Sequence, residues 1–286
     1  MNLPPNPFGS DSGNDIDIAD VRRLTDLVKQ KYNYDFKDYA MSSFKRRIKR
    51  LLDLYKFKNV DKLISVLETN TDFFEEFISE ITVNVTEMFR DPTFWKILKE
   101  QILPNILLQH EKLNIWHAGC SSGEEVYSMA ITLHEMGILD RTKLIATDLD
   151  TAIIKKAQHG GYSMKNMELN RKNYTRYGGT DSLDTYFKEI NGEAIMDKSL
   201  MQNVSFRRHD LVQGAVFSKF DLVLCRNVMI YFNQALQNTV LNRLHESLFK
   251  YGYLAIGSKE SLIWCEIASK FIVVNNEEKI YKKIKD

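Results

Sequence analysis

The sequence has little cysteine, with Cys120, Cys225 and Cys265 as its only three, and no two of them form a CxxC pair. Cysteines this far apart indicate neither a zinc knuckle nor a disulfide framework. The six histidines are equally scattered and lack the spacing of metal ligands to one another. We therefore predict no metal site in this chain.

Long hydrophobic runs and a strong net charge are also missing. No stretch approaches the roughly 20 apolar residues that a membrane-spanning helix needs, and the N-terminus lacks the profile of a signal peptide. We expect a cytoplasmic protein without membrane insertion. With 39 Lys and Arg against 38 Asp and Glu, the formal net charge is +1. This balance argues against nucleic acid as a partner, and a monomer is the default expectation.

The order of residue types along the chain predicts its domain organisation. Residues 1–15 have few large apolar side chains and predict a flexible tail. In residues 16–80 the apolar positions recur at helical spacing, which predicts a small all-helical domain. Residues 81–112 predict a linker and a connecting helix. In residues 113–286 short apolar strands alternate with helices, except in an insertion at about 160–202.

The alternating region predicts a mainly parallel sheet. The expected strands lie at residues 113–117, 143–147, 204–209, 220–225, 253–257, 271–274 and 279–284. A polar turn separates the last two strands, which predicts an antiparallel hairpin at the edge of the sheet. This α/β layout, a mixed seven-stranded sheet with one strand reversed near the end, is that of the Rossmann-like S-adenosylmethionine-dependent methyltransferases.

A glycine-containing turn follows the first of these strands, in residues 113–129, LNIWHAGCSSGEEVYSM. The apolar run stops at Gly119, and a helix restarts behind Gly123. Without side chains at these positions the backbone can approach a ligand, and the new helix points its N–H groups at the same place. The turn is typical of a cofactor site, although plain packing explains such glycines equally well.

Carboxylates follow the turn at the spacing that a nucleotide cofactor requires. Asp148 ends the second expected strand, where it can accept hydrogen bonds from ribose hydroxyls. The alternative is a helix N-cap, a role that suits Asp150 better. Glu124 can meet the methionine amino group or sulfonium of the cofactor, or can simply complement the charge of its helix terminus.

Two further strand ends carry polar residues. Asp210 follows the third expected strand and can accept from the exocyclic amine of an adenine. The run at 220–232, FDLVLCRNVMIYF, is apolar until it breaks into Arg226 and Asn227. An arginine after a buried strand needs anions or carbonyls, so we expect this pair to face the cofactor and substrate.

Five blocks of the sequence together resemble the chemotaxis receptor methyltransferases, the CheR family. They are VNVTEMFRDP (83–92), AGCSSGEEVYSMA (118–130), ATDLD (146–150), CRNVMIYF (225–232) and GSKES (257–261). The resemblance implies S-adenosylmethionine as methyl donor and S-adenosylhomocysteine as product. It also implies methylation of glutamate side chains on the cytoplasmic helical domain of chemoreceptors, giving γ-methyl esters.

The resemblance also implies roles for individual residues. The cofactor would contact Asn84, Thr86 and Arg90 of the interdomain segment, and Glu124, Asp148, Asp210, Leu211, Arg226 and Asn227 of the sheet domain, beside the turn at Gly119. Arg90 and Tyr231 match the residues expected beside the reacting carboxylate; alternatively, Tyr231 is a buried aromatic bonded to a carbonyl. Asp210 stands where the family commonly has Asn, which puts adenine affinity in question.

A basic run, FKRRIKR at 44–50, lies in the helical domain. On a helix Arg46, Lys49 and Arg50 form one face, which is either simply solvated or docks an acidic receptor helix. Two other functions stay open at this point. One is a methyltransferase acting on a small molecule or nucleic acid, and the other is a non-catalytic S-adenosylmethionine-binding scaffold.

Overall fold

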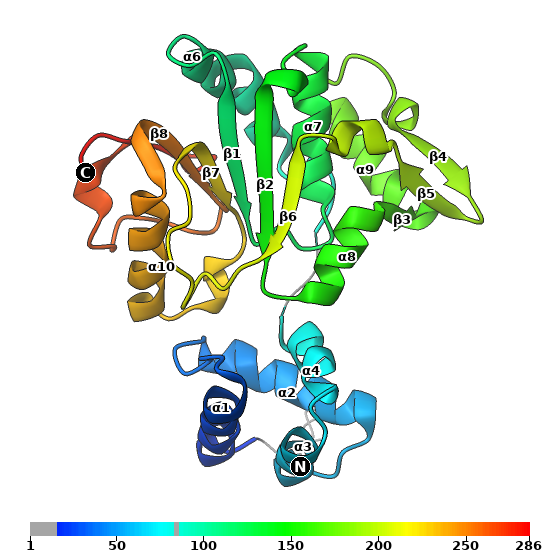
Figure 1. Ribbon diagram of the computed structural model, residues 1–286, viewed down its shortest axis with the longest axis vertical. Coiled ribbons are helices and arrows are strands. Elements are labelled where there is room, and N and C mark those ends of the chain that lie inside the picture. The colour runs from blue at the N-terminus through cyan, green and yellow to red at the C-terminus, as the bar shows by residue number, and fades with distance from the viewer. Residues whose placement is uncertain (1–15, 83–85) are drawn as a thin grey trace, which may run out of the picture.

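The computed structural model describes residues 16–82 and 86–286, which form two lobes (Figure 1). The smaller lobe contains four helices, α1 (Ile18–Tyr32), α2 (Met41–Tyr55), α3 (Val60–Thr69) and α4 (Phe73–Ile81). Their apolar faces, Leu24, Ile48, Leu63 and Phe77 among them, enclose a core of their own. Local signals set the helix ends: Asp17 caps α1 by accepting from the Ala19 N–H, and Asn59 caps α3 in the same way.

A connecting segment leads from the helical lobe to the sheet. It comprises α5 (Pro92–Ile97), a π-helical stretch (Leu98–Ile102) and α6 (Leu103–Leu107). Pro92 occupies the first helical position, where its missing N–H costs no hydrogen bond. Trp95 and Leu98 are buried against the sheet domain, so this segment belongs to the core of the larger lobe.

The larger lobe is built on a seven-stranded sheet in the order β6-β2-β1-β7-β8-β10-β9. The strands are β1 (Leu113–Ala118), β2 (Thr142–Asp148), β6 (Val204–Arg208), β7 (Phe220–Cys225), β8 (Leu248–Ile256), β9 (Phe271–Asn275) and β10 (Ile280–Lys283). Strands β6, β2, β1, β7 and β8 are parallel, whereas β10 is antiparallel to both of its neighbours. The predicted mixed sheet with a hairpin at its edge is thus confirmed.

Helices cover both faces of the sheet (Figure 1). One apolar core lies between the sheet, the connecting helices and α7 (Glu124–Glu135), and a second lies under α10 (Gln234–Glu246). Helix α8 (Thr151–His159) follows β2. Short 3-10 helices occur at Leu139–Arg141, Leu183–Tyr186, Lys198–Met201, Met229–Tyr231 and Ala268–Lys270.

Strand β8 begins at Leu248, ahead of the predicted start at residue 253. The first part of β8 is mostly exposed, and the register with β7 shifts there, so no apolar alternation marks it in the sequence. Gly252 sits at this irregularity, where an added Cβ would lie 3.0 Å from the Phe249 carbonyl oxygen.

The segment expected as an insertion, residues 160–202, holds a separate small sheet. Its strands are β3 (Gly161–Ser163), β4 (Phe187–Ile190) and β5 (Glu193–Met196), in the antiparallel order β3-β5-β4. Helix α9 (Met164–Tyr177) packs back against the connecting segment. There Asn170 accepts from the Met88 N–H, and Asn173 donates to the Met88 carbonyl.

The two lobes are joined by backbone hydrogen bonds beside Tyr231. The Ala40 N–H donates to the Tyr231 carbonyl at 2.8 Å, and the Asn233 N–H donates to the Asp38 carbonyl at 2.9 Å. The rings of Tyr39 and Phe232 pack edge to face between these bonds. The start of α2 is therefore held directly against the turn that carries Tyr231. Within the described residues, no helix combines the length and apolar character that crossing a membrane requires.

Candidate active site

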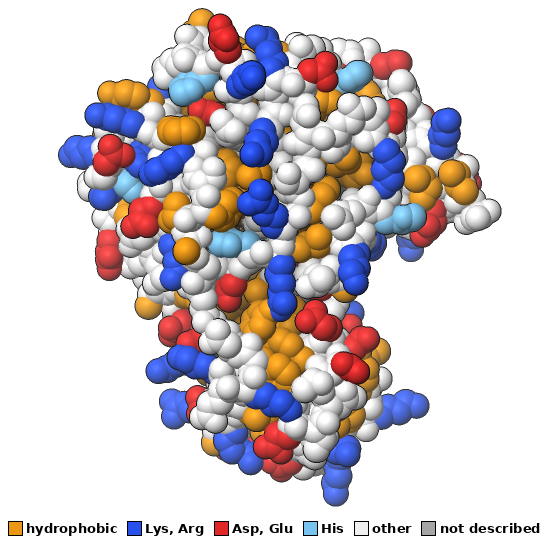
Figure 2. Space-filling model, in the orientation of Figure 1, with side chains coloured by type: hydrophobic (Ala, Val, Ile, Leu, Met, Phe, Trp, Pro, Cys, Tyr) orange, Lys and Arg blue, Asp and Glu red, His pale blue; other side chains and the backbone are white. Residues whose placement is uncertain are grey.

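An open cavity, about 1160 Å³ with the solvent space at its mouth included, lies between the helical lobe and the carboxyl ends of β1, β2, β6 and β7. Nine of the residues singled out from the sequence line it: Thr86, Arg90, Gly119, Asp148, Asp210, Leu211, Arg226, Asn227 and Tyr231. Asn84 lies outside the described residues. The face in Figure 2 carries basic and acidic side chains interspersed over both lobes.

The turn after β1 reaches the cavity through Gly119 and Ser121, both with positive φ (81° and 49°). An added Cβ at Gly119 would lie 2.6 Å from Val228 Cγ2, and one at Gly123 would lie 2.9 Å from Ala157 Cβ. Close packing thus accounts for both glycines. Of the two, Gly119 also lines the cavity, where its backbone is open to a ligand.

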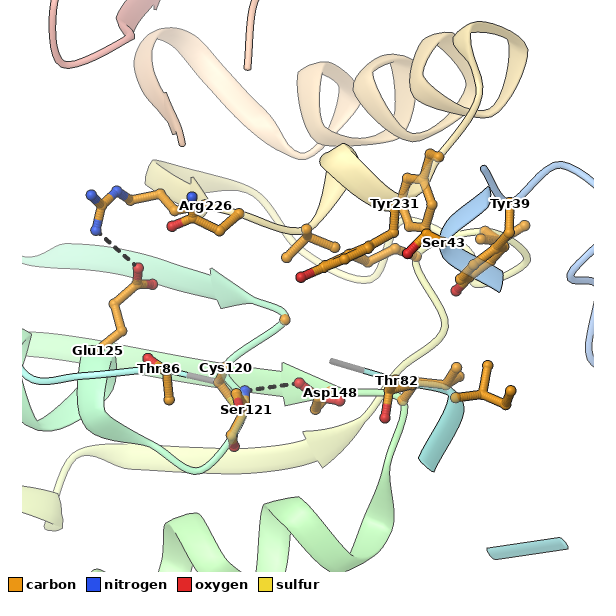
Figure 3. A pocket seen from close by; sticks show the side chains of 18 of the residues that line it. Tyr39, Ser43, Thr82, Thr86, Cys120, Ser121, Glu125, Asp148, Arg226 and Tyr231 are labelled. Carbon is orange, nitrogen blue, oxygen red and sulfur yellow. Dashed lines mark hydrogen bonds and ion pairs between the residues drawn. The ribbon is translucent and has the colours of Figure 1, made fainter. Parts of the chain in front are cut away.

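Asp148 sits at the end of β2 and faces the cavity while only 9% exposed. Its Oδ2 accepts from the Ser121 N–H at 2.8 Å (Figure 3), and its Oδ1 accepts from the Asp150 N–H at 3.1 Å. Burial raises the pKa of Asp148, and these backbone bonds partly offset that rise. Asp150 is the N-cap of α8, so the two carboxylates have separate roles.

The two adjacent glutamates at the start of α7 point differently. Glu124 is 4% exposed, accepts from the Ser122 hydroxyl at 2.6 Å and is not among the residues that line the cavity. Glu125 does line it. Consecutive positions on an α-helix are about 100° apart, so the rotation of α7 decides which one reaches the ligand. Sequence reasoning selected Glu124 and missed Glu125.

Burial without an ion pair raises the pKa of Glu124 to about 7, partly offset by the Ser122 hydrogen bond. The unfolded chain releases this proton at lower pH, so the contribution of Glu124 to stability should fall as pH rises from about 4.5 to 7. We expect Glu124→Gln to match wild type near pH 4 and to be more stable by about 3 kcal/mol at pH 8. Urea unfolding at several pH values measures this difference.

Glu125→Gln provides the matched control for this prediction. Burial opposes ionisation there too, but the His117 hydrogen bond and the charges of His117 and Arg226 hold the pKa of Glu125 below its usual value. The Glu125→Gln variant should therefore be less stable than wild type at pH 8. Equal pH profiles for Glu124→Gln and wild type would contradict the expectation.

Arg226 anchors the inner side of the cavity. Its side chain is only 3% exposed and donates to Asp91 at 2.7 Å. It also donates to Glu125 at 3.4 Å (Figure 3). The guanidinium also lies 4.0 Å from the ring centroid of Phe94. Glu125 accepts a further contact from His117 at 2.8 Å. The sequence predicted that Arg226 needs anions or carbonyls nearby, and the structure shows Asp91 and Glu125 as its anionic partners.

The backbone around Arg90 is strained. Phe89 and Asp91 both have positive φ, 52° and 55°, which is rare for residues with side chains. The Phe89 N–H donates to the Ser128 hydroxyl at 2.8 Å, and the Trp95 indole donates to the Arg90 carbonyl at 3.0 Å. These contacts hold Arg90, which lines the cavity, in one place.

The turn after β7 carries Asn227 and Tyr231 and is fixed by a buried carboxylate. Glu260 accepts from the N–H groups of Gly257, Asn227 and Ile230 at 2.6, 3.3 and 3.1 Å. Asn227 adopts a φ of 61° there. Burial raises the pKa of Tyr231, against the lowering effect of the charges of Arg47, Arg90 and Arg46. The Tyr231 hydroxyl therefore lies in a positive surrounding.

Asp210 and Leu211 line the cavity after β6. The Oδ1 of Asp210 accepts from the Val212 and Gln213 N–H groups at 2.7 and 3.2 Å, so this carboxylate also holds its own turn. An asparagine oxygen can accept the same bonds. The departure from the family pattern at this position thus keeps the local turn.

The basic face predicted on α2 is exposed and lies outside the cavity lining. Arg46, Lys49 and Arg50 are on the surface, and Arg50 pairs with Glu80 at 3.4 Å. The same helix instead directs Ser43 and Arg47 at the cavity. Sequence reasoning missed the lining residues Tyr39, Ser43, Arg47, Thr82 and Glu125. The helical spacing of Ser43 and Arg47, one turn apart, is the signal that links them to one face.

A sheet of this strand order, with a small-residue turn after β1 and a carboxylate at the end of β2 beside a cavity, defines the class of S-adenosylmethionine-dependent methyltransferases. Comparisons with known proteins identify the family. A model described as "CheR methyltransferase, SAM binding domain" matches residues 84–280, and one described as "CheR methyltransferase, all-alpha domain" matches residues 19–82.

Curated relatives match most of the chain. A Pseudomonas putida protein named "Putative methyltransferase Cher3" is 39% identical over 274 residues, 96% of this chain and 99% of that one. "Chemotaxis protein methyltransferase" of Listeria monocytogenes is 34% identical, covering 85% and 90%. "Chemotaxis protein methyltransferase 1" of Pseudomonas aeruginosa is 31% identical, covering 79% and 83%.

The chain belongs to the CheR methyltransferase family, which confirms the resemblance found in the sequence. It is an S-adenosylmethionine-dependent protein methyltransferase of chemotaxis. The cavity fits this cofactor chemically. The Asp148 carboxylate faces the cavity from the strand end at which such folds bind ribose hydroxyls. The Glu125 carboxylate also lines the cavity and can bind a cationic group of the cofactor.

Proposed function

We propose that this methyltransferase esterifies glutamate side chains on the cytoplasmic helical domain of chemoreceptors. The supporting observation is the division of charge in the cavity. The charges of Arg47 and Arg90 act on the Tyr231 hydroxyl, whereas the charges of Asp148 and Asp210 act on the Tyr39 hydroxyl. Such a cavity suits a cationic donor and an anionic acceptor side by side.

Methyl transfer to a carboxylate requires that the enzyme align the two reactants and exclude water. A glutamate with a pKa of about 4.3 is already ionised at neutral pH, so no general base is needed. Bound S-adenosylmethionine supplies an electrophilic methyl group: a carboxylate oxygen forms the O–CH₃ bond, the C–S pair passes to sulfur, and no proton moves. Arg90 orients the carboxylate and Tyr231 donates one hydrogen bond to it. The two lobes exclude water from the reacting charges.

In this proposal the exposed face of α2 binds the receptor. Arg46, Lys49 and Arg50 meet acidic residues of the receptor helix that carries the target glutamate. Because these side chains are exposed, they act mainly on the encounter rate and lose effect as salt rises. We further propose that the enzyme is a cytoplasmic monomer.

The test is methyl transfer from radiolabelled S-adenosylmethionine to a purified cytoplasmic receptor fragment, followed by alkali to release methanol from esters. Wild type should give base-labile label, and Arg90→Ala should lose about 100-fold in rate. Tyr231→Phe removes one hydrogen bond and should lose about 10-fold. Absence of label on the receptor, with cofactor binding intact in calorimetry, would refute the proposal in favour of another acceptor or a scaffold.

A further inference from the structure

Arg47 is a cavity residue that the family resemblance did not single out. It projects from α2 of the helical lobe and lines the same cavity as Arg90 and Tyr231. Its side chain is half-buried, and the Nε atom is enclosed without a hydrogen-bond partner. Burial lowers its pKa, as expected for a guanidinium that has lost water.

Two other arginines, one in the cavity and one on the exposed side of α2, have anionic partners. Arg226 pairs with Asp91 and Glu125, and the more exposed Arg50 pairs with Glu80. Within residues 16–82 and 86–286, no ion pair joins Arg47 to a carboxylate. A partly desolvated cation with an unsatisfied N–H is costly unless a ligand completes it. An anionic group in the cavity is the ligand that fits.

The position of Arg47 relative to Tyr231 is fixed by direct contacts. The Ala40 N–H bonds to the Tyr231 carbonyl, and the Phe44 N–H bonds to the Ala40 carbonyl at the start of α2. Ser43, one helical turn before Arg47, points into the cavity near Tyr231 (Figure 3). Arg47 therefore belongs to the part of the cavity where the acceptor carboxylate meets Tyr231.

We propose that Arg47 is a second guanidinium ligand of the acceptor carboxylate, so that both lobes hold the reacting side chain. Arg90 approaches from the segment before α5 and Arg47 from α2, and both line the same cavity as Tyr231. This inference rests on the proposed function and deepens it: it makes the helical lobe part of the acceptor site in addition to a docking surface. It also predicts that a neutral glutamine is a poor ligand, because it cannot compensate two guanidinium groups.

The experiment compares Arg47→Met with Arg46→Met, an equal loss of charge on the exposed face of the same helix. With the receptor fragment, Arg47→Met should lower kcat/KM at least about 30-fold at both low and high salt. Arg46→Met should lower it less than about 5-fold, and mainly at low salt. Affinity for S-adenosylhomocysteine, measured by calorimetry, should stay within about 2-fold for both variants, which also reports that they fold.

Arg47→Lys provides a second variant that keeps the charge. Lysine cannot form the planar two-bond contact with a carboxylate, so an intermediate loss of about 10-fold is expected. Wild-type kcat/KM in Arg47→Met would overturn the inference while leaving receptor methylation intact. An equal loss of S-adenosylhomocysteine affinity would also overturn it and assign the guanidinium to the cofactor. If the wild-type enzyme itself forms no base-labile ester on the receptor fragment, the result refutes the proposed function, on which this inference rests.

Discussion

Replacing Asp148 with asparagine is expected to weaken S-adenosylhomocysteine binding by about two to four orders of magnitude. The carboxylate lies in the cavity with little access to water. Two charge-assisted hydrogen bonds to the ribose hydroxyls would contribute about 1.5 to 3 kcal/mol each there. Both of its oxygens also accept backbone N–H groups, from Ser121 and Asp150. An asparagine must turn its NH₂ toward one of these donors, which disturbs the turn as well.

Asp150→Asn is the matched control. Asp150 caps α8 by accepting from the Ala152 and Ile153 N–H groups and does not line the cavity. Asparagine is an equally good N-cap, so calorimetry should show an affinity within about 2-fold of wild type. Because burial raises the pKa of Asp148, wild-type affinity should also weaken on acidification, as the carboxylate takes up a proton. Unchanged affinity in Asp148→Asn would remove the ribose role from this residue.

The second large effect is expected in the free energy of unfolding of Arg226→Met. The guanidinium is almost fully buried between Asp91 and Glu125 and over the ring of Phe94. Methionine fills part of the space but removes the guanidinium partner of Glu125, and among the described residues His117 remains in contact with it. Breaking a buried pair in this way costs about 3 to 5 kcal/mol, which urea unfolding of the cofactor-free protein measures.

A double mutant separates the ion pair from simple loss of volume. Adding Glu125→Gln to Arg226→Met should recover part of the lost stability, because no unpaired carboxylate then remains. Arg171→Met is the surface comparison, since the Arg171–Asp184 pair is largely exposed, and it should cost less than about 1 kcal/mol. If Arg226→Met were no more destabilising than Arg171→Met, Arg226 would not be an anchor of the cavity.

The sequence predicted the sheet well because most of its strands are short apolar runs that end at polar residues. Strands β1, β2, β6 and β7 lie within a residue of their expected bounds, and the candidate residues after them meet at one edge. Parallel strands bring their carboxyl ends together, so Asp148, Asp210 and Arg226 converge for a topological reason. The mostly exposed start of β8 has no such pattern, and its beginning was misplaced.

The sequence by itself determined the fold, the family and the residue types of the site, because these depend on periodicity and on blocks of adjacent residues. Only the tertiary structure decided which neighbour faces the cavity, Glu125 or Glu124 on α7 and Arg47 or Arg46 on α2. Adjacent helical positions differ by about 100° in direction, and helix rotation is set by packing against the rest of the molecule. The bonds that hold Ala40 and Asp38 of the helical lobe to the turn of Tyr231 fix that rotation for α2, and they join residues far apart in the chain.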